Sequence, residues 1–439
     1  MTGDISINPA EPDGAPRIAV MDILRGIAIL GILFMNIADM GQSFHASTAD
    51  IMHLGWDGWD QLAWWLREVL ANGTTRGLLE MLFGAGMVIL TDRVATRVGE
   101  QALLRRYYVR NIVLFLLGVV HMYVLLWPGD ILHSYGIAAL IAVLARAWQP
   151  RWLLAAGMMM AALQLTFGGY FDYYQAKVWT AEVSAIEQRV LAGEAINPAE
   201  RALLDDARDR RAHDAKRATE VSAQIAAEDR GRRGDTRSWV TTQIEVSRSR
   251  FPAAMEIFVV WEALGTMLIG AALFKLGVIQ GRRSHRFYLT MTLIAYGVAI
   301  PLRLIGAWEQ ASLAEGPHIT VFTVETARLL MTLGHVGLVN LLIVRAGGLQ
   351  LLRPFEAAGK TALSVYVAQT LITLWLLFPP FGLHLYGQLT WAPLLVMALA
   401  INLALLILAN LYLRYFDIGP VEWLWRSLIA WRALPWRRG

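Results

Sequence analysis

Three polar residues interrupt an apolar stretch near the start of the chain, and their spacing places them on one side of a helix. Asp22, Arg25 and Asn36 lie within the otherwise apolar residues 18–40. Arg25 and Asn36 are about three helical turns apart, and Asp22 precedes Arg25 by the spacing of an ion pair. Ionisable groups inside a membrane span are costly and often mark a functional pathway. One interpretation is structural, a paired charge and a helix-packing amide. The other has Arg25 bind an anion such as a phosphate, while Asn36 orients a group farther along the helix.

Histidines form a second group of candidates, on the predicted outer side of the membrane. His45 lies in the first predicted outer loop, His121 lies near the outer end of a predicted span, and Asp130 and His133 follow a Trp-Pro-Gly turn. An imidazole is suited to act as the general base in acyl transfer, and a carboxylate can fix its tautomer. Each residue alone can equally be an ordinary loop or packing residue. No ligand spacing indicates a metal site, so we expect none.

Polar residues in the later apolar stretches form a third group. Glu325 and Arg328 are three apart and are predicted to pair. The others could line a polar substrate cavity or a path for proton-coupled transport. The members of this group are Glu262, Arg303, Glu325, Arg328, His335, Tyr366 and Gln369.

The elements that must position these residues are membrane helices. The 439 residues are 56% hydrophobic and 17% charged, whereas a soluble protein carries roughly 25% charged residues. The apolar residues fall in blocks, which predicts an all-α, polytopic membrane protein in contact with the lipid bilayer. The chain has no cysteine, which excludes disulfides and thiol nucleophiles. It also has no P-loop, dinucleotide-binding or nucleophile-elbow motif, and nothing suggests nucleic-acid binding.

We predict about ten spans, and the charges of the connecting segments orient them. Arginine and lysine gather in alternate loops, so the positive-inside rule places both termini in the cytoplasm and the protein in the bacterial inner membrane. The polar first residues lack the features of a cleaved signal. The predicted spans are 18–40, 62–91, 108–127, 131–147, 152–171, 253–279, 287–307, 319–344, 358–379 and 392–414.

A long charged segment divides the spans into two halves of five. Its composition favours helix, with a break at Asn197-Pro198, and it is expected outside as a solvated helical hairpin or as a lid or docking site. The predicted divisions are a cytoplasmic tail at 1–17, a first membrane half at 18–171, the extracytoplasmic segment at 172–252, a second half at 253–414, and a cytoplasmic motif with a basic tail at 415–439. A homo-oligomer is compatible with this organisation, although small-residue motifs are too common to decide it.

Several motifs resemble those of the YeiB-like family of bacterial inner-membrane proteins, a family of undefined function. The first is M-D-I-L-R-G-I-A-I-L-G-I-L-F-M-N-I at 21–37, and the last and most specific is R-Y-F-x-x-G-P-V-E-W-L-W-R at 414–426. Between them lie L-F-G-A-G at 82–86, G-D-I-L-x-x-Y-G at 129–136 and G-x-x-A-L-x-x-Y-x-x-Q-T-L-I at 359–372. The resemblance covers essentially the whole chain, and the long outer segment looks like an enlarged insertion.

The first span is also similar to that of a wider superfamily of transmembrane acyltransferases, which includes O-antigen acetylases and lysosomal heparan-glucosaminide N-acetyltransferase. That similarity implies transfer of an acyl group from cytoplasmic acyl-CoA, such as acetyl-CoA, to an acceptor on the other side. Arg25 matches an arginine that is followed in the O-acetylases by a histidine, whose position is Asn36 here. The lysosomal branch has asparagine there and its working histidine in the next loop, where His45 is the best equivalent. The similarity therefore implies His45 as base or acyl relay, Asn36 as an oxyanion or acceptor contact, and Arg25 as a contact to the donor.

The sequence thus favours a transmembrane acyltransferase whose acceptor is a sugar or glycolipid. His133 and Asp130 are further catalytic candidates, and the candidate binding residues are Arg25, Asp22, His121, Glu262, Tyr366 and Gln369. One alternative is a transporter or exporter of a small polar metabolite, with Glu262, Arg303 and His335 along its path. Another is a non-catalytic scaffold or receptor that works through the long outer segment.

Overall fold

The chain is helical throughout its described parts. A computed structural model describes residues 19–98, 100–250, 253–313, 316–345 and 348–437, and the predicted tail at 1–17 lies outside them. Within these residues the only β-type pairing is an isolated bridge between Phe416 and Arg437. The all-α prediction is confirmed.

In the part of the chain that the structure describes, five helices are long and apolar enough to cross a membrane: α1 (Ala19–Gly41), α11 (Ala253–Lys275), α12 (His285–Ala311), α13 (Thr320–Val344) and α16 (Trp391–Tyr412). A sixth candidate is bent by 71° between Lys360 and Ala362, where α14 (Gly348–Lys360) meets α15 (Ala362–Thr370) and η4 (Leu371–Leu377). The chain is therefore a helical membrane protein. Each of the ten predicted ranges contains helix, but ten crossings remain a prediction.

The remaining helices of the bundle are shorter or carry more charge. They are α2 (Ala46–Ala49), α3 (Gly58–Leu66), η1 (Arg67–Ala71), α4 (Thr74–Val98), α5 (Glu100–Tyr123), α6 (Leu132–Ala142), η2 (Val143–Ala145), α7 (Pro150–Leu163), η3 (Gln164–Tyr170) and α17 (Pro420–Ala430). The second predicted span is broken between η1 and α4. Gly73 lies at that break with φ +74°, a backbone conformation that glycine adopts without strain.

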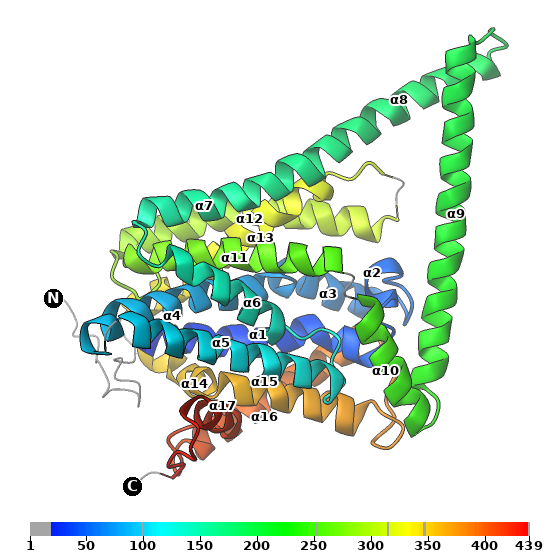
Figure 1. Cartoon of the computed structure of the whole chain (residues 1–439). Helices are drawn as coiled ribbons and strands as arrows, with labels where there is room; N and C mark the ends of the chain where they lie inside the picture. Colours follow the sequence, from blue (N-terminus) through cyan, green and yellow to red (C-terminus); the bar gives the residue numbers. More distant parts are fainter. Residues whose placement is uncertain (1–18, 99, 251–252, 314–315, 346–347, 438–439) are drawn as a thin grey trace.

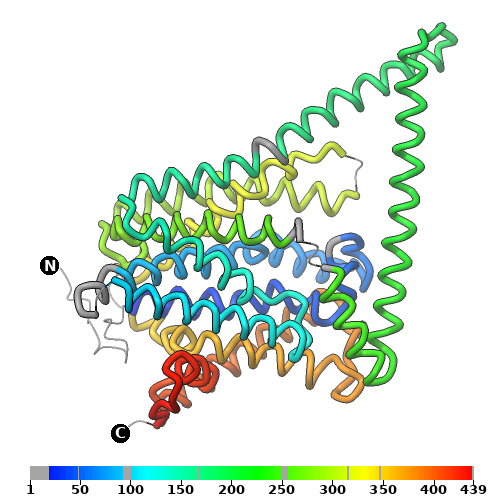
Figure 2. The backbone as a smooth tube through the Cα atoms, in the orientation of Figure 1, coloured from blue at the N-terminus to red at the C-terminus, as the bar shows by residue number. Residues whose placement is uncertain are grey.

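The long helices run side by side, with α1 near the middle of the bundle (Figure 1). Most of α1 is buried, and it packs against α14, α4 and α16. The start of α1 and helix α17 lie at one end of the bundle, which we call the terminal end, while α2 and α10 (Thr236–Arg250) lie at the opposite end (Figure 2). Both ends matter for function because polar residues gather at each of them.

The segment predicted to lie outside forms three helices. Helix α8 (Phe171–Leu191) continues from η3 and leaves the bundle, and α9 (Pro198–Arg232) returns across the end opposite α17 (Figure 1). We call α9 and α10 together the strap, and that end of the bundle the strap end. The predicted break is confirmed, because Asn197 caps α9 in a capping box with Glu200 and Pro198 opens the helix.

Helices α1 and α14 approach each other closely through two glycines. A Cβ on Gly26 would clash with the carbonyl of Phe355, and a Cβ on Gly359 would clash with the carbonyl of Asp22. Glycine at both positions lets the two backbones come into contact. This contact sets Arg25 on α1 beside Lys360 at the end of α14, where both line the same cavity.

Candidate active site

A cavity of about 220 Å³ lies between α1, α4, α5 and α15. Its mouth is at the terminal end, where residues of α17 line it, and it extends inward to Ile131, Tyr135 and Tyr366. The part of the cavity between these two ends is lined mostly by apolar residues. Its lining there consists of Ile29, Leu79, Leu82, Phe83, Met87, Leu114 and Leu132, among others. An apolar lining of this kind suits the apolar part of a ligand whose polar end stays at the mouth.

The mouth of the cavity is rich in positive charge. Four cationic side chains line it, Arg25, Arg110, Lys360 and Arg426, against the carboxylates of Asp22 and Glu422. The predicted pair between Arg25 and Asp22 is confirmed at 2.6 Å, and Lys360 pairs with Glu356 at 2.5 Å. The excess of arginine suits an anionic ligand such as a phosphate.

Helix α17 is fixed to the bundle by Glu422, which is buried. Its carboxylate accepts hydrogen bonds from the backbone amides of Leu363 at 2.6 Å and Ser364 at 3.1 Å, and from the Ser364 hydroxyl. Burial raises the pKa of the Glu422 carboxyl above its ordinary value, although these hydrogen bonds oppose that rise. The most specific sequence motif therefore builds one wall of the cavity mouth, because Glu422, Trp425 and Arg426 all belong to it.

Two histidines share one buried carboxylate just beyond the inner end of the cavity. Asp130 is completely buried, with Oδ1 at 2.7 Å from His121 Nδ1 and Oδ2 at 2.9 Å from His133 Nδ1. The Tyr366 hydroxyl, on the cavity wall, lies 3.5 Å from Asp130 Oδ1. A buried carboxylate requires such partners. We call Asp130, His121, His133 and Tyr366 the Asp130 cluster.

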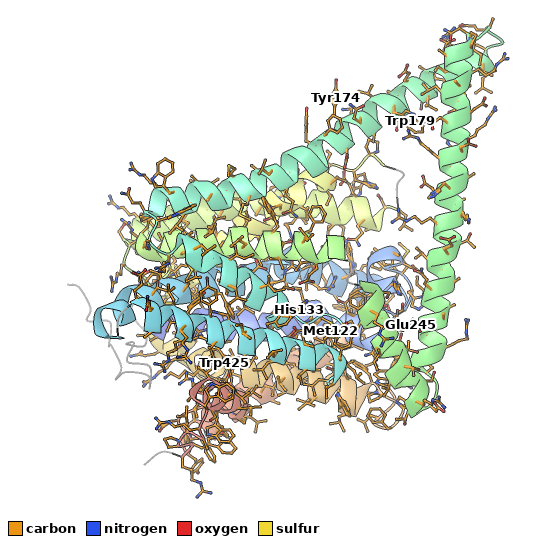
Figure 3. The ribbon with its side chains drawn as sticks, in the orientation of Figure 1. Met122, His133, Tyr174, Trp179, Glu245 and Trp425 are labelled. Carbon is orange, nitrogen blue, oxygen red and sulfur yellow. The ribbon has the colours of Figure 1, made fainter. Side chains whose placement is uncertain are left out.

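The two histidines differ in what their second nitrogen contacts. His121 Nε2 lies 2.9 Å from the Thr370 hydroxyl, so both of its nitrogens are held inside the bundle. His133 Nε2 lies 3.3 Å from Glu256 and 3.1 Å from the Ser134 hydroxyl. The side chain of Glu256 is 23% exposed, whereas that of His121 is 1% exposed. His133 is therefore the histidine whose polar contacts lead away from the cavity, toward the partly exposed Glu256. It lies nearer to the strap end of the bundle than Trp425 does (Figure 3).

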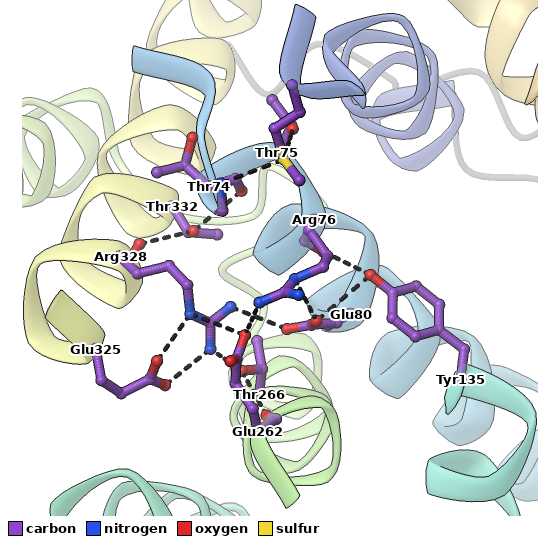
Figure 4. A network of polar contacts seen from close by, with 12 residues as sticks. Thr74, Thr75, Arg76, Glu80, Tyr135, Glu262, Thr266, Glu325, Arg328 and Thr332 are labelled. Atoms are coloured by element: carbon purple, nitrogen blue, oxygen red, sulfur yellow. Dashed lines mark hydrogen bonds and ion pairs between the residues drawn. The ribbon is translucent and has the colours of Figure 1, made fainter. Parts of the chain in front are cut away.

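A second set of buried charges lies between α4, α11 and α13 (Figure 4). Arg328 contacts three carboxylates: Glu325 at 2.8 Å, Glu80 at 3.0 Å and Glu262 at 3.3 Å. The predicted pair of Glu325 and Arg328 is thus confirmed. Arg76 also contacts Glu262, and the Tyr135 hydroxyl reaches Glu80 at 3.4 Å. We call Arg76, Glu80, Glu262, Glu325 and Arg328 the charge network.

A third polar cluster joins the strap to the strap end of α1. Glu228 on α9 accepts hydrogen bonds from the Ser43 hydroxyl at 2.5 Å and the Phe44 amide at 2.9 Å. Arg232 donates to the carbonyls of Met40 at 2.6 Å and Gln42 at 2.7 Å, so it caps the last turn of α1. The backbone amide of His45 also donates to Glu228, at 3.3 Å.

The structure brings some of the predicted site residues together and separates others. Arg25, Asp22 and Tyr366 line the cavity, and Asp130, His121 and His133 form the cluster beside it. His45 lies instead by the strap, and Asn36 is buried on α1 about 16 Å beyond Arg25 by helical rise. Glu262 belongs to the charge network, while Gln369 donates to the Ile29 carbonyl and to Asn402 between helices.

The residues named for a transport path also have separate surroundings. Arg303 donates to the carbonyls of Val69 and Asn72 at the end of η1. His335 bonds to the Tyr296 hydroxyl at 2.8 Å and to the Leu70 carbonyl at 3.0 Å. Neither residue lines the cavity at the terminal end. Their roles in transport stay a prediction.

Sequence reasoning did not single out several residues of the site. Glu256 and Ser134 complete the route from His133, and Arg110 and Trp425 shape the mouth. The available signals were the closing motif, which contains Trp425, and the position of Glu256 at the start of an apolar stretch. Within the described residues, no group of three His, Asp or Glu side chains is arranged to hold a metal ion.

Comparison with known proteins finds relatives whose names assign no activity. Residues 273–432 match the family model described as "Protein of unknown function (DUF418)". "Uncharacterized protein YxaH" of Bacillus subtilis is 27% identical over 434 residues, 95% of this chain and 96% of that relative. "Uncharacterized protein YeiB" of Escherichia coli is 27% identical over 435 residues, 95% of this chain and 98% of the relative.

A shorter match supports the same grouping. An "Uncharacterized 39.9 kDa protein in amylase 3'region" of Bacillus acidopullulyticus is 32% identical over 101 residues, 23% of this chain and 28% of that protein. The two longer relatives cover both membrane halves and the segment between them. The resemblance predicted from the motifs is confirmed: the chain is similar to YeiB and YxaH over 95% of its length, and residues 273–432 match the DUF418 family model.

Proposed function

We propose that the protein transfers an acyl group from a thioester donor, held in the cavity, to a hydroxyl or amine acceptor on the strap side. The observation that carries this proposal is the Asp130 cluster. One carboxylate separates Tyr366, on the cavity wall, from His133, whose second nitrogen faces a partly exposed glutamate. A donor chain in the cavity and an acceptor near Glu256 would therefore meet at a histidine–carboxylate pair.

The orientation in the membrane follows from the loop charges. Ten spans with both termini in the cytoplasm would make the terminal end cytoplasmic and would put the strap outside, and the positive-inside pattern supports this arrangement. The donor would then be acyl-CoA, with acetyl-CoA as the simplest case, and the acceptor a sugar or glycolipid beyond the inner membrane. The arginines at the mouth support an anionic donor.

The proposed reaction needs one base and one proton return. Asp130 accepts a hydrogen bond from His133 Nδ1–H, which directs Nε2 toward Ser134 and Glu256. An acceptor that enters between Nε2 and these groups would give its proton to Nε2. The acceptor oxygen or nitrogen attacks the thioester carbonyl, the carbon–sulfur bond breaks, and the imidazolium returns the proton to the leaving thiolate. Tyr366 is the polar group on the cavity wall that can stabilise charge on the carbonyl oxygen.

This proposal gives His133 the role that the superfamily similarity assigns to His45. The reason is position. The backbone amide of His45 binds Glu228 of the strap, while His133 shares Asp130 with the cavity wall. His45 and Asn36 remain candidates for contacts to the acceptor, because both lie toward the strap end of α1.

The absence of cysteine makes turnover simple to measure, because released CoA is the only thiol present. Purified protein in native-lipid vesicles is given acetyl-CoA and a thiol-reactive dye, and acetyl-CoA binding is measured separately by calorimetry. We expect binding that weakens in Arg25→Gln and thiol release that is lost in His133→Ala. His53→Ala is the matched control, since His53 pairs with Asp229 at 2.8 Å by the strap. A protein that is folded but binds no thioester contradicts the proposal.

One observation favours transport of a small polar metabolite as a second candidate. The charge network has three carboxylates and two guanidinium groups, so it carries one excess negative charge when all are ionised, and Tyr135 joins it to the cavity. Such a network can hold a transported proton. Proton-linked uptake that fails in Glu262→Gln, with no thiol release by the parent protein, would select this alternative.

A further inference from the structure

A shallow depression adjoins the mouth of the cavity between α5 and α17. It shares five lining residues with the cavity: Leu90, Tyr107, Arg110, Trp425 and Arg426. Arg106 lines the depression as well, one helical turn before Arg110 on α5. The two hollows therefore form one continuous site, with a deep apolar arm and a shallow arm whose lining includes three arginines.

The shallow arm combines arginines with aromatic rings. The Arg110 guanidinium lies 4.5 Å from the centroid of the Trp425 ring, and the Trp425 indole N–H donates to the Arg110 carbonyl at 3.3 Å. Tyr107 adds a second ring to the lining. The cavity and the depression together have five cationic side chains and two carboxylates in their lining.

We propose that the depression between α5 and α17 binds the phosphate-bearing nucleotide end of the donor, while the cavity takes its thioester arm. This inference rests on the proposed acyl transfer and names the class of donor, an acyl thioester of a phosphorylated nucleoside. Arginine forks match phosphate oxygens, and aromatic rings stack on a base. The continuity of the two hollows links the nucleotide to the reacting carbonyl.

The α17 helix is then a recognition element and not merely a cap on the bundle. Trp425 and Arg426 are neighbours on that helix and both line the two hollows. Glu422 holds the helix against the start of α15 through Leu363 and Ser364. The closing motif of the sequence would thus be specific because it both fixes the helix and recognises the donor.

The test compares fragments of the donor on the purified full-length protein by calorimetry. The probes are acetyl-CoA, 3′-dephospho-CoA, adenosine 3′,5′-bisphosphate and acetyl-pantetheine. We expect the bisphosphate to bind and to compete with acetyl-CoA, and we expect its affinity to fall about tenfold or more in Arg426→Gln and in Arg106→Gln. Arg432→Gln, an exposed arginine just beyond α17, is the matched control and should leave affinity unchanged. Arg426→Lys, which keeps the charge, guards against misfolding and should lose less affinity.

The outcomes separate the two proposals. If acetyl-pantetheine binds and reacts as well as acetyl-CoA, and the bisphosphate does not compete, the nucleotide site is wrong while acyl transfer stands. If the bisphosphate binds through Arg426 but no thioester releases a thiol, the nucleotide site stands and acyl transfer is wrong.

An anionic lipid headgroup is the other source of phosphate for the same arginines. Repeating the titration in nanodiscs with and without phosphatidylglycerol distinguishes the two. Displacement of the bisphosphate by phosphatidylglycerol, abolished in Arg426→Gln, would assign the depression to lipid and overturn the inference. Equal affinity in both kinds of nanodisc supports it.

Discussion

The Asp130 cluster and the charge network are both buried polar groups between membrane helices, but of the two only the cluster contributes a residue to the lining of the cavity at the terminal end. Tyr366 of the cluster lines a cavity of about 220 Å³, and His133 leads away from it to the partly exposed Glu256. In the network, Arg328 and its three carboxylates contact one another. Tyr135, which lines the cavity, connects the network to it through the bond of its hydroxyl to Glu80.

Buried ionisable residues in a membrane protein can therefore have either a structural or a functional role. Charge inside a span is costly, but pairing can offset that cost, and a fully paired set can simply join helices. A set that borders a cavity and also contacts a partly exposed carboxylate can exchange protons with a substrate. We therefore expect substitutions in the cluster to remove activity, and substitutions in the network to remove stability.

The largest effect is expected from Asp130→Asn. The amide cannot hold both imidazoles in the required tautomer, so thiol release from acetyl-CoA should fall about 10²- to 10⁴-fold, the usual contribution of general-base catalysis. Asp229→Asn is the matched control, because Asp229 also pairs with a histidine, His53, at 2.8 Å, but belongs to the strap. Equal losses in the two variants would remove the distinction between the cluster and other histidine–carboxylate pairs.

Arg328→Met should chiefly affect stability. It leaves Glu80, Glu262 and Glu325 without their shared partner, and removing one member of a buried ion pair typically costs about 3–5 kcal/mol. Unfolding in mild detergent measures the loss. Arg208→Met, which breaks an exposed pair on α9, should cost at most about 1 kcal/mol. Similar values for the two variants would show that the network does not support the bundle.

Arg25→Gln should weaken the binding of acetyl-CoA by about tenfold, with little effect on unfolding. Its side chain is 34% exposed at the cavity mouth, where a charge-assisted hydrogen bond to a phosphate is worth about 1.5–3 kcal/mol. Calorimetry gives the affinity, and Lys216→Gln on the exposed face of α9 serves as the control. If the affinity for acetyl-CoA and the turnover were both unchanged in Arg25→Gln, Arg25 would not be part of the donor site.

The smallest effect concerns pH and Glu422, at the contact of α17 with α15. Because burial raises its pKa in the folded protein, the folded state binds this proton more tightly than the unfolded state does. The associated stability is present at low pH and is lost as pH rises through the raised pKa. Unfolding temperatures at pH 5 and pH 8 should thus differ by a few degrees more in the parent protein than in Glu422→Gln. The same pH dependence in both would contradict this reasoning.

Local patterns in the sequence predicted much of the fold. Apolar blocks indicated membrane helices, and the three-residue spacings of Asp22 with Arg25 and of Glu325 with Arg328 gave ion pairs that are present. The break before α9 followed from Asn197-Pro198. These features depend on residues within one or two helical turns, which a single sequence displays directly. The 71° bend between α14 and α15 depends on packing against α1, and the sequence did not show it.

The candidate site was predictable only in part, because its members come from distant helices. Asp130 and His133 were named together since they flank one turn, but Glu256 is 123 residues from His133. The outer histidines were expected to converge on one face, and His121 and His133 do meet at Asp130. His45 lies by the strap because Glu228, 183 residues away, binds its amide. Such distances depend on which helix faces pack together, and periodicity alone does not specify this.

The most direct test of the proposed acyl transfer is to find out from which side of the membrane the donor supports thiol release. The protein is reconstituted into vesicles that contain native lipid extract, with α17 accessible on one side only, and membrane-impermeant acetyl-CoA is supplied to either face in turn. We expect CoA thiol to appear only when the donor is on the α17 side, and we expect Asp130→Asn to abolish this release. Thiol release when the donor is supplied to the strap side, or release by Asp130→Asn at the rate of the parent protein, would contradict the proposed acyl transfer.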